Sequence, residues 1–160
     1  MLRLLKYAKQ FVLTRLAEIR FGQAPQEARL QCFGTKDGRW CCLKTLLNAE
    51  SVVYSFGVGE DVSFDLGLID EYGLCVHAFD PTPRSKEYVR DHVDTSRFIF
   101  HPFGIGAKSG NLTFVGPQNP LHVSLSTRRS TSKEAARHVL PVVSLRDIMS
   151  RLGHDIMWTF

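Results

Sequence analysis

The sequence predicts an α/β domain built on a parallel β-sheet. Three short apolar runs, rich in β-branched and aromatic residues, are predicted as buried strands, and two stretches with helical spacing separate them. The order strand–helix–strand–helix–strand is typical of parallel βαβ units. With 160 residues, of which 44% are hydrophobic and 22% charged, the chain has the length and composition of a single folded domain.

The N-terminal segment predicts an amphipathic helix, because apolar residues recur on one helical face over residues 2–19. Charges interrupt this segment too often for a secretory signal. We expect the helix to pack on the domain or on a partner, with contact to a membrane surface as the less favoured alternative. Residues 1–37 are assigned to this helix and a polar linker, and residues 38–160 to the α/β domain. A second short helix is predicted over Arg39 to Asn48.

The central segment supplies the predicted parallel sheet. A strand over residues 51–56 is followed by a glycine turn and a helix over residues 61–72, which Gly73 ends. A second strand over residues 74–79 leads through a helix over residues 83–92 to a third strand over residues 97–102.

Beyond the third strand the pattern changes. Gly110-Asn111 is a turn signal before a β-hairpin element over residues 112–115, and residues 116–132 have the Gly, Pro, Asn and Ser content of a loop. A strand over residues 139–143 and a helix over residues 144–152 complete the prediction, with the serine at the start of this helix as its N-cap.

The glycine turn and a following acid predict a nucleoside pocket. Gly57 and Gly59 can adopt backbone angles closed to other residues and allow a ligand to touch the main chain. Asp80 follows the second strand, where an acidic group can accept hydrogen bonds from ribose hydroxyls. Because parallel strands end at the same edge of a sheet, we expect the turn and the acid to face one crevice.

The residues after the turn argue against a dinucleotide. A dinucleotide site usually has a third glycine where this chain has Val62, and Glu60 and Asp61 would repel a pyrophosphate. Both carboxylates are compatible with a cationic nucleoside such as S-adenosylmethionine. They are equally compatible with simple complementation of the helix dipole.

Three sequence blocks resemble the FkbM-type methyltransferases, especially the branch of methyltransferase-like proteins. They read SVVYSFGVGEDVSFDLGLIDEYGLCVHAFDPTPRS, FIFHPFGIGAKSGNLTF and VLPVVSLRDIMSRLGHD, and the similarity extends from Gly38 to Asp155. The resemblance implies a class I Rossmann-like fold, S-adenosylmethionine as methyl donor, and O-methylation of a small molecule or sugar.

The resemblance also implies the cofactor-binding residues. Gly57, Val58 and Gly59 would line the methionine side of the cofactor, and Asp80 would bind the ribose. The residues that would flank the adenosine are Phe79 and Pro81, with residues 103–106 bordering the adenine.

One departure from the family concerns the acid that many class I enzymes carry just before the first glycine. Ser55 occupies this neighbourhood here, and we expect Glu60 or Asp61 to supply the missing charge at the cofactor. Ser63 is expected to hydrogen-bond near the same turn.

The second departure concerns the end of the chain. Family members continue into a fourth strand with an acidic motif, whereas this sequence ends in IMWTF. The expectation is weak or absent methyltransferase activity, from a fragment, a gene-model error or a degenerate copy. The alternatives are a non-catalytic nucleoside-binding or partner-binding remnant and, less favoured, an NAD-dependent oxidoreductase.

The catalytic base stays unassigned. His77 lies within the second predicted strand and is expected to be a packed core residue. His101, at the end of the third strand, and His122, in the predicted loop, are the other candidates. The methyl acceptor is expected to be a small molecule that the sequence does not identify.

Composition restricts the other partners and the compartment. The net charge of +4 is small and scattered, so a nucleic-acid partner is not expected. The four cysteines, Cys32, Cys41, Cys42 and Cys75, lack metal-ligand spacing, so no metal site is expected. We expect all four to be reduced thiols in a cytoplasmic protein.

Overall fold

The computed structural model describes residues 30–44, 47–116, 125–127 and 136–154. They belong to two compact units, which are described separately. The main unit comprises residues 32–40 and the described residues from 48 onward, and residues 30–31, 41–44 and 47 belong to the other unit. The N-terminal helix predicted over residues 2–19 lies outside the described residues.

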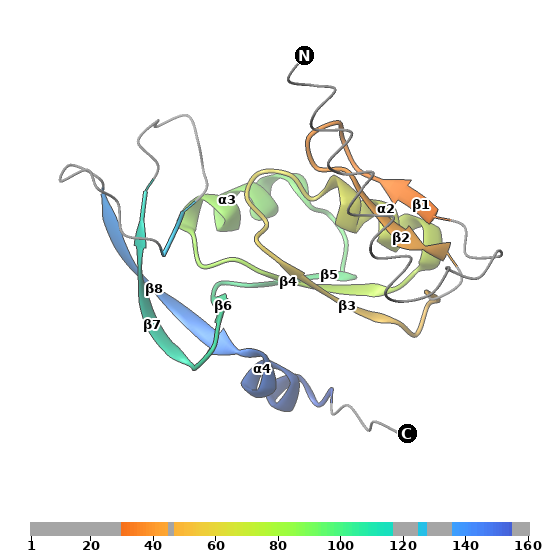
Figure 1. The fold of residues 1–160 in the computed structure, drawn as a ribbon. Helices are drawn as coiled ribbons and strands as arrows, with labels where there is room; N and C mark the ends of the chain where they lie inside the picture. Colours follow the sequence, from red (N-terminus) through yellow and green to blue (C-terminus); the bar gives the residue numbers. More distant parts are fainter. Residues whose placement is uncertain (1–29, 45–46, 117–124, 128–135, 155–160) are drawn as a thin grey trace, which may run out of the picture. The chain divides into compact units, whose positions relative to one another are not determined.

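A parallel three-stranded sheet forms the centre of the main unit. It consists of β3 (Val52–Phe56), β4 (Cys75–Phe79) and β5 (Phe98–His101), in the order β3-β4-β5 (Figure 1). Both neighbouring pairs are parallel, with Val52 opposite Cys75 and Val76 opposite Phe98. The predicted parallel βαβ order is confirmed, each strand lying within one or two residues of its predicted bounds.

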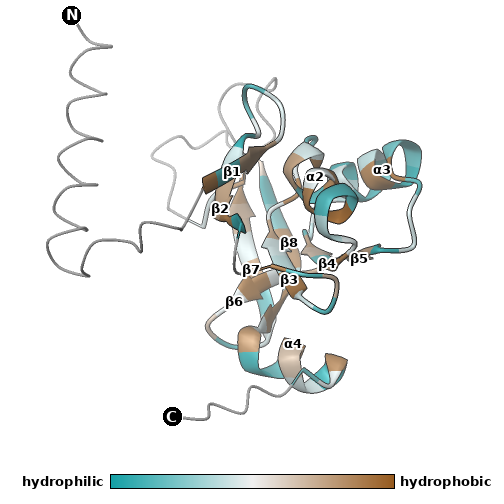
Figure 2. Cartoon of the chain, turned by 90° about the vertical axis from the view of Figure 1, so that its right-hand side faces the viewer, coloured by the Kyte–Doolittle hydropathy of each residue, from teal (hydrophilic) through white to brown (hydrophobic). Residues whose placement is uncertain are grey.

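Helices cover both faces of this sheet. The first two, α2 (Ser63–Tyr72) and α3 (Pro83–His92), lie on one side, and α4 (Leu145–Leu152) lies on the other, as Figures 1 and 2 both show. The strands between them carry mostly apolar residues (Figure 2). α2 ends at Gly73, and the Ser144 side chain accepts a hydrogen bond from the Asp147 amide at the start of α4. Both predicted helix boundaries are confirmed.

A second sheet lies beyond β5. It consists of β6 (Gly104–Gly106), β7 (Gly110–Val115) and β8 (Arg137–Ser144) in the order β6-β8-β7. β7 is antiparallel to β8, so the predicted hairpin element pairs with the later predicted strand, whereas β6 was not predicted. Most of the loop predicted over residues 116–132 lies outside the described residues.

The helix predicted over residues 39–48 is wrong. The chain instead forms two short strands, β1 (Leu30–Phe33) and β2 (Trp40–Leu43), which make a two-stranded sheet. A run as short as Trp-Cys-Cys-Leu has no helical or strand period of its own, so periodicity does not distinguish the two structures.

The expectation of four reduced thiols is also wrong. Cys32 and Cys41 are disulfide-bonded, whereas Cys42 and Cys75 are free. Disulfides are typical of oxidising compartments, so this finding does not support the cytoplasmic location inferred from the cysteines. Among the described residues, no helix has the length and apolar character needed to cross a membrane.

Alternate residues of β3 and β4 face opposite sides of the parallel sheet. On the α4 side, Phe79 forms a core cluster with Val143 and Ile148, against which Tyr54, Phe103 and Leu152 pack. On the other side, beneath α2 and α3, Val76 and Ala78 are fully buried. The central strand β4 is therefore buried on both faces of the sheet, as its near-continuous apolar sequence requires.

Three histidines meet on the α4 side of the sheet. His77 Nδ1 lies 3.0 Å from His101 Nε2, and the Tyr54 hydroxyl lies 2.6 Å from Nδ1 of His154, just beyond α4. His77 is 8% exposed, which confirms the prediction of a packed core residue. Burial lowers the pKa of His77 and of His101, and the neighbouring imidazoles of His101 and His154 lower the pKa of His77 further.

These shifts make the stability of the fold depend on pH. Because the folded pKa values of His77 and His101 lie below the unfolded value of about 6.5, the unfolded chain binds more protons in mild acid. The associated stability is complete above that unfolded value and is lost as the pH falls below it, toward the folded pKa values. In urea unfolding, we expect His101→Gln to reduce this loss, because one of the two groups no longer titrates.

The matched control is His138→Gln, at an exposed position on β8. It should leave the pH dependence of the unfolding free energy unchanged. If His101→Gln and the unaltered chain lose stability equally as the pH falls, the histidine cluster does not cause the acid sensitivity.

Candidate functional site

A glycine turn follows β3 at its carboxyl end. Gly57 has φ 89° and Gly59 has φ 59°, values in the region that glycine tolerates best. The Gly57 amide donates a hydrogen bond to the Phe79 carbonyl at 2.9 Å, which fixes the turn to the end of β4. A methyl group added at Gly57 would meet nothing within 4 Å. The turn therefore presents bare main chain to open space.

Asp80 holds this turn in place from the end of β4. Its Oδ2 accepts hydrogen bonds from the amides of Val58 at 3.0 Å and Gly59 at 3.2 Å. The Asp80 side chain is nearly buried, with 6% of the residue exposed. Hydrogen bonds from amides to a buried carboxylate are strong, and they require no basic partner. The predicted pairing of glycine turn and acid is therefore a direct contact.

The second carboxylate oxygen of Asp80 connects the turn to α3. Oδ1 accepts hydrogen bonds from the Thr82 amide at 2.8 Å and the Thr82 hydroxyl at 2.6 Å. Thr82 is the N-cap of α3, where its Oγ1 accepts from the Ser85 amide at 3.3 Å. A carboxylate offers about four acceptor positions. The four hydrogen bonds from Val58, Gly59 and Thr82 therefore use the whole acceptor capacity of Asp80.

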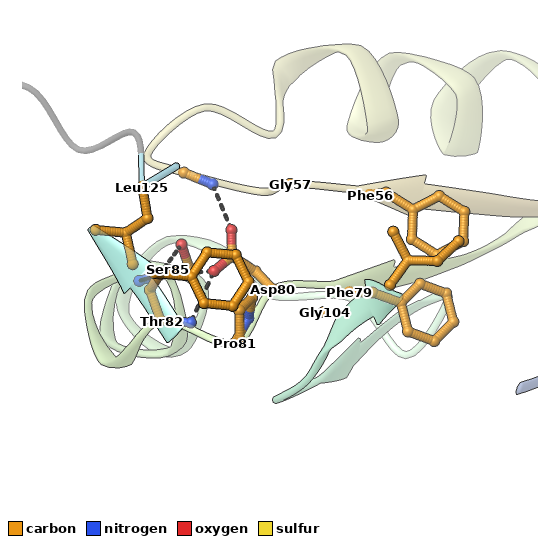
Figure 3. A pocket seen from close by; sticks show the side chains of 12 residues that line it. Phe56, Gly57, Phe79, Asp80, Pro81, Thr82, Ser85, Gly104 and Leu125 are labelled. Carbon is orange, nitrogen blue, oxygen red and sulfur yellow. Dashed lines mark hydrogen bonds between the residues drawn. The ribbon is translucent and has the colours of Figure 1, made fainter. Parts of the chain in front are cut away.

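A cavity of about 370 Å³ opens beside Asp80 at the carboxyl ends of β3 and β4 (Figure 3). Phe56 and Phe79 line it with stacked rings whose centroids are 5.1 Å apart. The remaining wall is formed by small, apolar and hydroxyl residues, which are Gly57, Gly59, Pro81, Thr82, Ser85, Gly104, Ile105, Phe114 and Leu125. The cavity is therefore mostly apolar and has one ionisable wall residue, Asp80, among the described residues.

Five of the cofactor-binding residues inferred from the sequence meet at this cavity. They are Gly57, Gly59, Phe79, Asp80 and Pro81. In the stretch 103–106, expected to border an adenine, Gly104 and Ile105 line the cavity, whereas Phe103 packs against Phe79 at a centroid distance of 5.6 Å.

The other three inferred residues do not line the cavity. The Val58 side chain is buried, and only its amide takes part, through Asp80. Glu60 forms an exposed ion pair with Arg84 at 2.7 Å. The Ser63 hydroxyl accepts a hydrogen bond from the Thr35 amide at 2.8 Å. Glu60 and Ser63 thus hold neighbouring parts of the chain, a role that their place in sequence did not reveal.

Several lining residues escaped the sequence analysis. Thr82 carries a local signal, since Thr-Pro before a helix is a typical N-cap and first-turn pair. Phe114 and Leu125 carry none, because they are far from the glycine turn in sequence and reach the cavity only through the second sheet and the residues beyond it.

The histidines considered as catalytic bases do not line this cavity. His77 and His101 contact each other on the α4 side of the sheet, and His122 lies outside the described residues. In the described part of the chain, no group of three or more His, Cys, Asp or Glu side chains is arranged to hold a metal ion.

Comparison with known proteins gives no match at any level. No protein family, no curated protein and no solved structure matches the chain.

The contacts of Asp80 lead to a stability prediction. Asp80→Asn keeps the shape of the side chain but replaces one carboxylate oxygen, which accepts hydrogen bonds, by an NH2 group, which can only donate them. At least one of the donors on Val58, Gly59 and Thr82 then loses its acceptor. We expect a loss of roughly 1–3 kcal/mol in the free energy of unfolding, measured by urea denaturation.

Asp94→Asn is the matched control, because Asp94 is an exposed aspartate on the same unit. Its unfolding free energy should stay close to that of the unaltered chain. Equal stability of the two variants would mean that Asp80 does not hold the glycine turn.

Proposed function

We propose that the chain binds S-adenosylmethionine in the cavity beside Asp80, as a methyltransferase-type domain. One observation carries the proposal: a bare glycine turn and a carboxylate lie in contact at the carboxyl ends of two neighbouring parallel strands and form one wall of a cavity. In open α/β sheets, ligands bind in the crevice outside the carboxyl ends of the strands.

The size and surface of the cavity support a nucleoside. A volume of about 370 Å³ is near the lower end of the range of small-molecule sites. Phe56, Phe79 and Ile105 give it apolar walls suited to a flat base. Gly57 allows a ligand to approach the main chain closely, because a side chain added there would meet open space.

The hydrogen bonds of the turn favour a ligand without a pyrophosphate. Dinucleotide sites hold the pyrophosphate on free amides at the turn and the helix N-terminus. Here the Val58 and Gly59 amides donate to Asp80, and the Ser63 amide at the start of α2 donates to Asp61 Oδ1 at 2.9 Å. Carboxylates thus occupy amides that a phosphate would need, so S-adenosylmethionine fits better than NAD.

Asp80 remains the candidate for the ribose, with a condition. Because its four acceptor positions are in use, a ribose hydroxyl must replace one of the present donors. The Thr82 hydroxyl is the most replaceable donor, since it lies 2.8 Å from the Ser85 hydroxyl and can donate there instead. Ligand binding would then rotate the Thr82 hydroxyl from Asp80 to Ser85 and leave the hydrogen bonds of the glycine turn unchanged.

One observation also favours the alternative of binding without catalysis. Methyl transfer to a hydroxyl requires positioning and, in most cases, a base. Among the described lining residues, Asp80 is the one ionisable group, and its oxygens are engaged. O-methylation of a small-molecule acceptor therefore needs a base from elsewhere, whereas nucleoside binding needs nothing further.

Binding is tested by calorimetric titration with S-adenosylmethionine, S-adenosylhomocysteine and NAD. We expect the two sulfur-containing nucleosides to bind and NAD not to bind. Ile105→Ala removes part of the apolar wall and should weaken S-adenosylhomocysteine about fivefold, which corresponds to roughly 1 kcal/mol of lost burial.

Leu112→Ala, at a similarly exposed leucine on β7 that does not line the cavity, should bind as the unaltered chain does. Binding of NAD alone would contradict the proposal. Binding of S-adenosylhomocysteine without turnover on any acceptor would support the non-catalytic alternative.

A further inference from the structure

The end of α4 is connected to the parallel sheet through a histidine. His154 follows this helix, and its Nδ1 lies 2.6 Å from the Tyr54 hydroxyl on β3, while its ring centroid lies 5.2 Å from that of His77 on β4. The His154 amide donates a hydrogen bond to the Met149 carbonyl at 2.9 Å, at the last turn of α4. His154 therefore joins the end of the helix to two strands.

His77 and His101 form the second part of this histidine cluster, which comprises His77, His101 and His154. Nδ1 of His77 lies 3.0 Å from Nε2 of His101, and the two rings are nearly parallel. A hydrogen bond between imidazole nitrogens needs one protonated donor and one unprotonated acceptor, whereas a cationic imidazole carries a proton on both nitrogens. If both rings were cationic, two N–H groups and two like charges would face each other, and the hydrogen bond would be lost.

No carboxylate among the described residues offsets a positive charge in the histidine cluster. Burial lowers the pKa of both His77 and His101, and the acidic residues of the described chain do not act on either group. The titratable group that β3 contributes is the Tyr54 phenol, whose pKa is raised by burial, so it stays neutral in mild acid. A proton taken up by the packed cluster is therefore uncompensated.

The charged residues of α4 act away from the cluster. The Asp147 carboxylate accepts a hydrogen bond from the Ser109 hydroxyl, and Arg146 and Arg151 lower the pKa of Asp147. Of the described helices, α4 is the one on this side of the sheet (Figures 1 and 2). Release of α4 is therefore the change that would expose the histidine cluster to water.

Exposure to water would favour proton uptake. In water, the pKa values of His77 and His101 return to about 6.5, above their values in the packed fold. The released form then binds more protons in mild acid, and its population rises about tenfold per pH unit for each additional proton bound. The packed form is favoured above about pH 6.5 and loses this advantage as the pH falls toward the lowered pKa values.

We propose that the histidine cluster is an acid-sensitive switch, which releases α4 and His154 from the sheet before the rest of the domain unfolds. The His77–His101 hydrogen bond and the contact of His154 with Tyr54 hold the packed state near neutral pH. In mild acid, proton uptake favours the released state, in which the apolar side of the sheet under α4 is exposed. This goes beyond a general loss of stability in acid, because α4 opens first.

Hydrogen exchange of single amides tests the order of opening. The His154 amide at the end of α4 and the Gly73 amide at the end of α2 are matched probes, since they donate to helix carbonyls at 2.9 and 2.8 Å. From about pH 7.5 to about pH 5.5, protection factors in α4 should fall up to about tenfold per pH unit for each proton taken up, whereas those in α2 should stay constant. Equal losses in both helices, or no loss in α4, overturn the proposal.

His101→Gln removes one titrating ring of the cluster, so the protection of α4 should depend less steeply on pH. His138→Gln, at an exposed position on β8, is the control and should keep the slope of the unaltered chain. The same slope in both variants would contradict the switch.

A further measurement uses the unaltered chain and does not depend on a variant folding. Nitrogen-15 NMR of the imidazoles should show that His77 and His101 take up protons over the same pH range in which α4 loses its protection. If both rings stay neutral throughout that range, the histidine cluster does not release the helix.

Discussion

The arrangement of the site depends on one contact, between the Asp80 carboxylate and the amides of the glycine turn. Val58 and Gly59 would otherwise leave two amide donors unsatisfied beside an apolar cavity, a cost of about 1–3 kcal/mol each. Asp80 satisfies them and, through Thr82, joins the same hydrogen-bond network to the start of α3. The turn, the end of β4 and the N-terminus of α3 are therefore positioned together, and the cavity keeps its wall without a ligand.

The contact between Asp80 and the glycine turn also affects the inference that Asp80 binds a ribose. An acid at the end of the second strand predicts a ribose ligand only if its oxygens are free to accept hydrogen bonds. Both oxygens of Asp80 already accept hydrogen bonds from protein groups. Engaged amides also weaken the case for phosphate recognition, because they are the groups a pyrophosphate would bind. The proposed nucleoside ligand is therefore one that does not depend on hydrogen bonds from the Val58 and Gly59 amides, since both donate to Asp80.

Sequence patterns predicted the parallel sheet and its helices because β3, β4 and β5 are apolar runs bounded by turn residues, and each helix has a local signal such as Ser144 or Gly73. They did not predict β1, β2 or β6, which are strands of three or four residues with no period long enough to detect. For the site, they found the residues that follow β3 and β4. They missed Phe114 and Leu125, because only the path of the second sheet brings these side chains to the cavity.

The acids around the turn show why a role cannot be assigned from sequence position alone. Glu60 and Asp61 immediately follow the glycine turn, and the sequence made them the candidates to contact a cationic ligand. In the structure, Glu60 forms an ion pair with Arg84, and Asp61 accepts hydrogen bonds from Thr35 and Ser63. Asp65, one helical turn later, has a buried oxygen with no hydrogen-bond partner in the described part of the chain. The 3.6-residue period of α2 places Asp65 against β3, where the Ser55 side chain forms a hydrogen bond with it. The hydrogen-bond partners of an acid, which the sequence alone does not give, therefore decide whether its charge is available to a ligand.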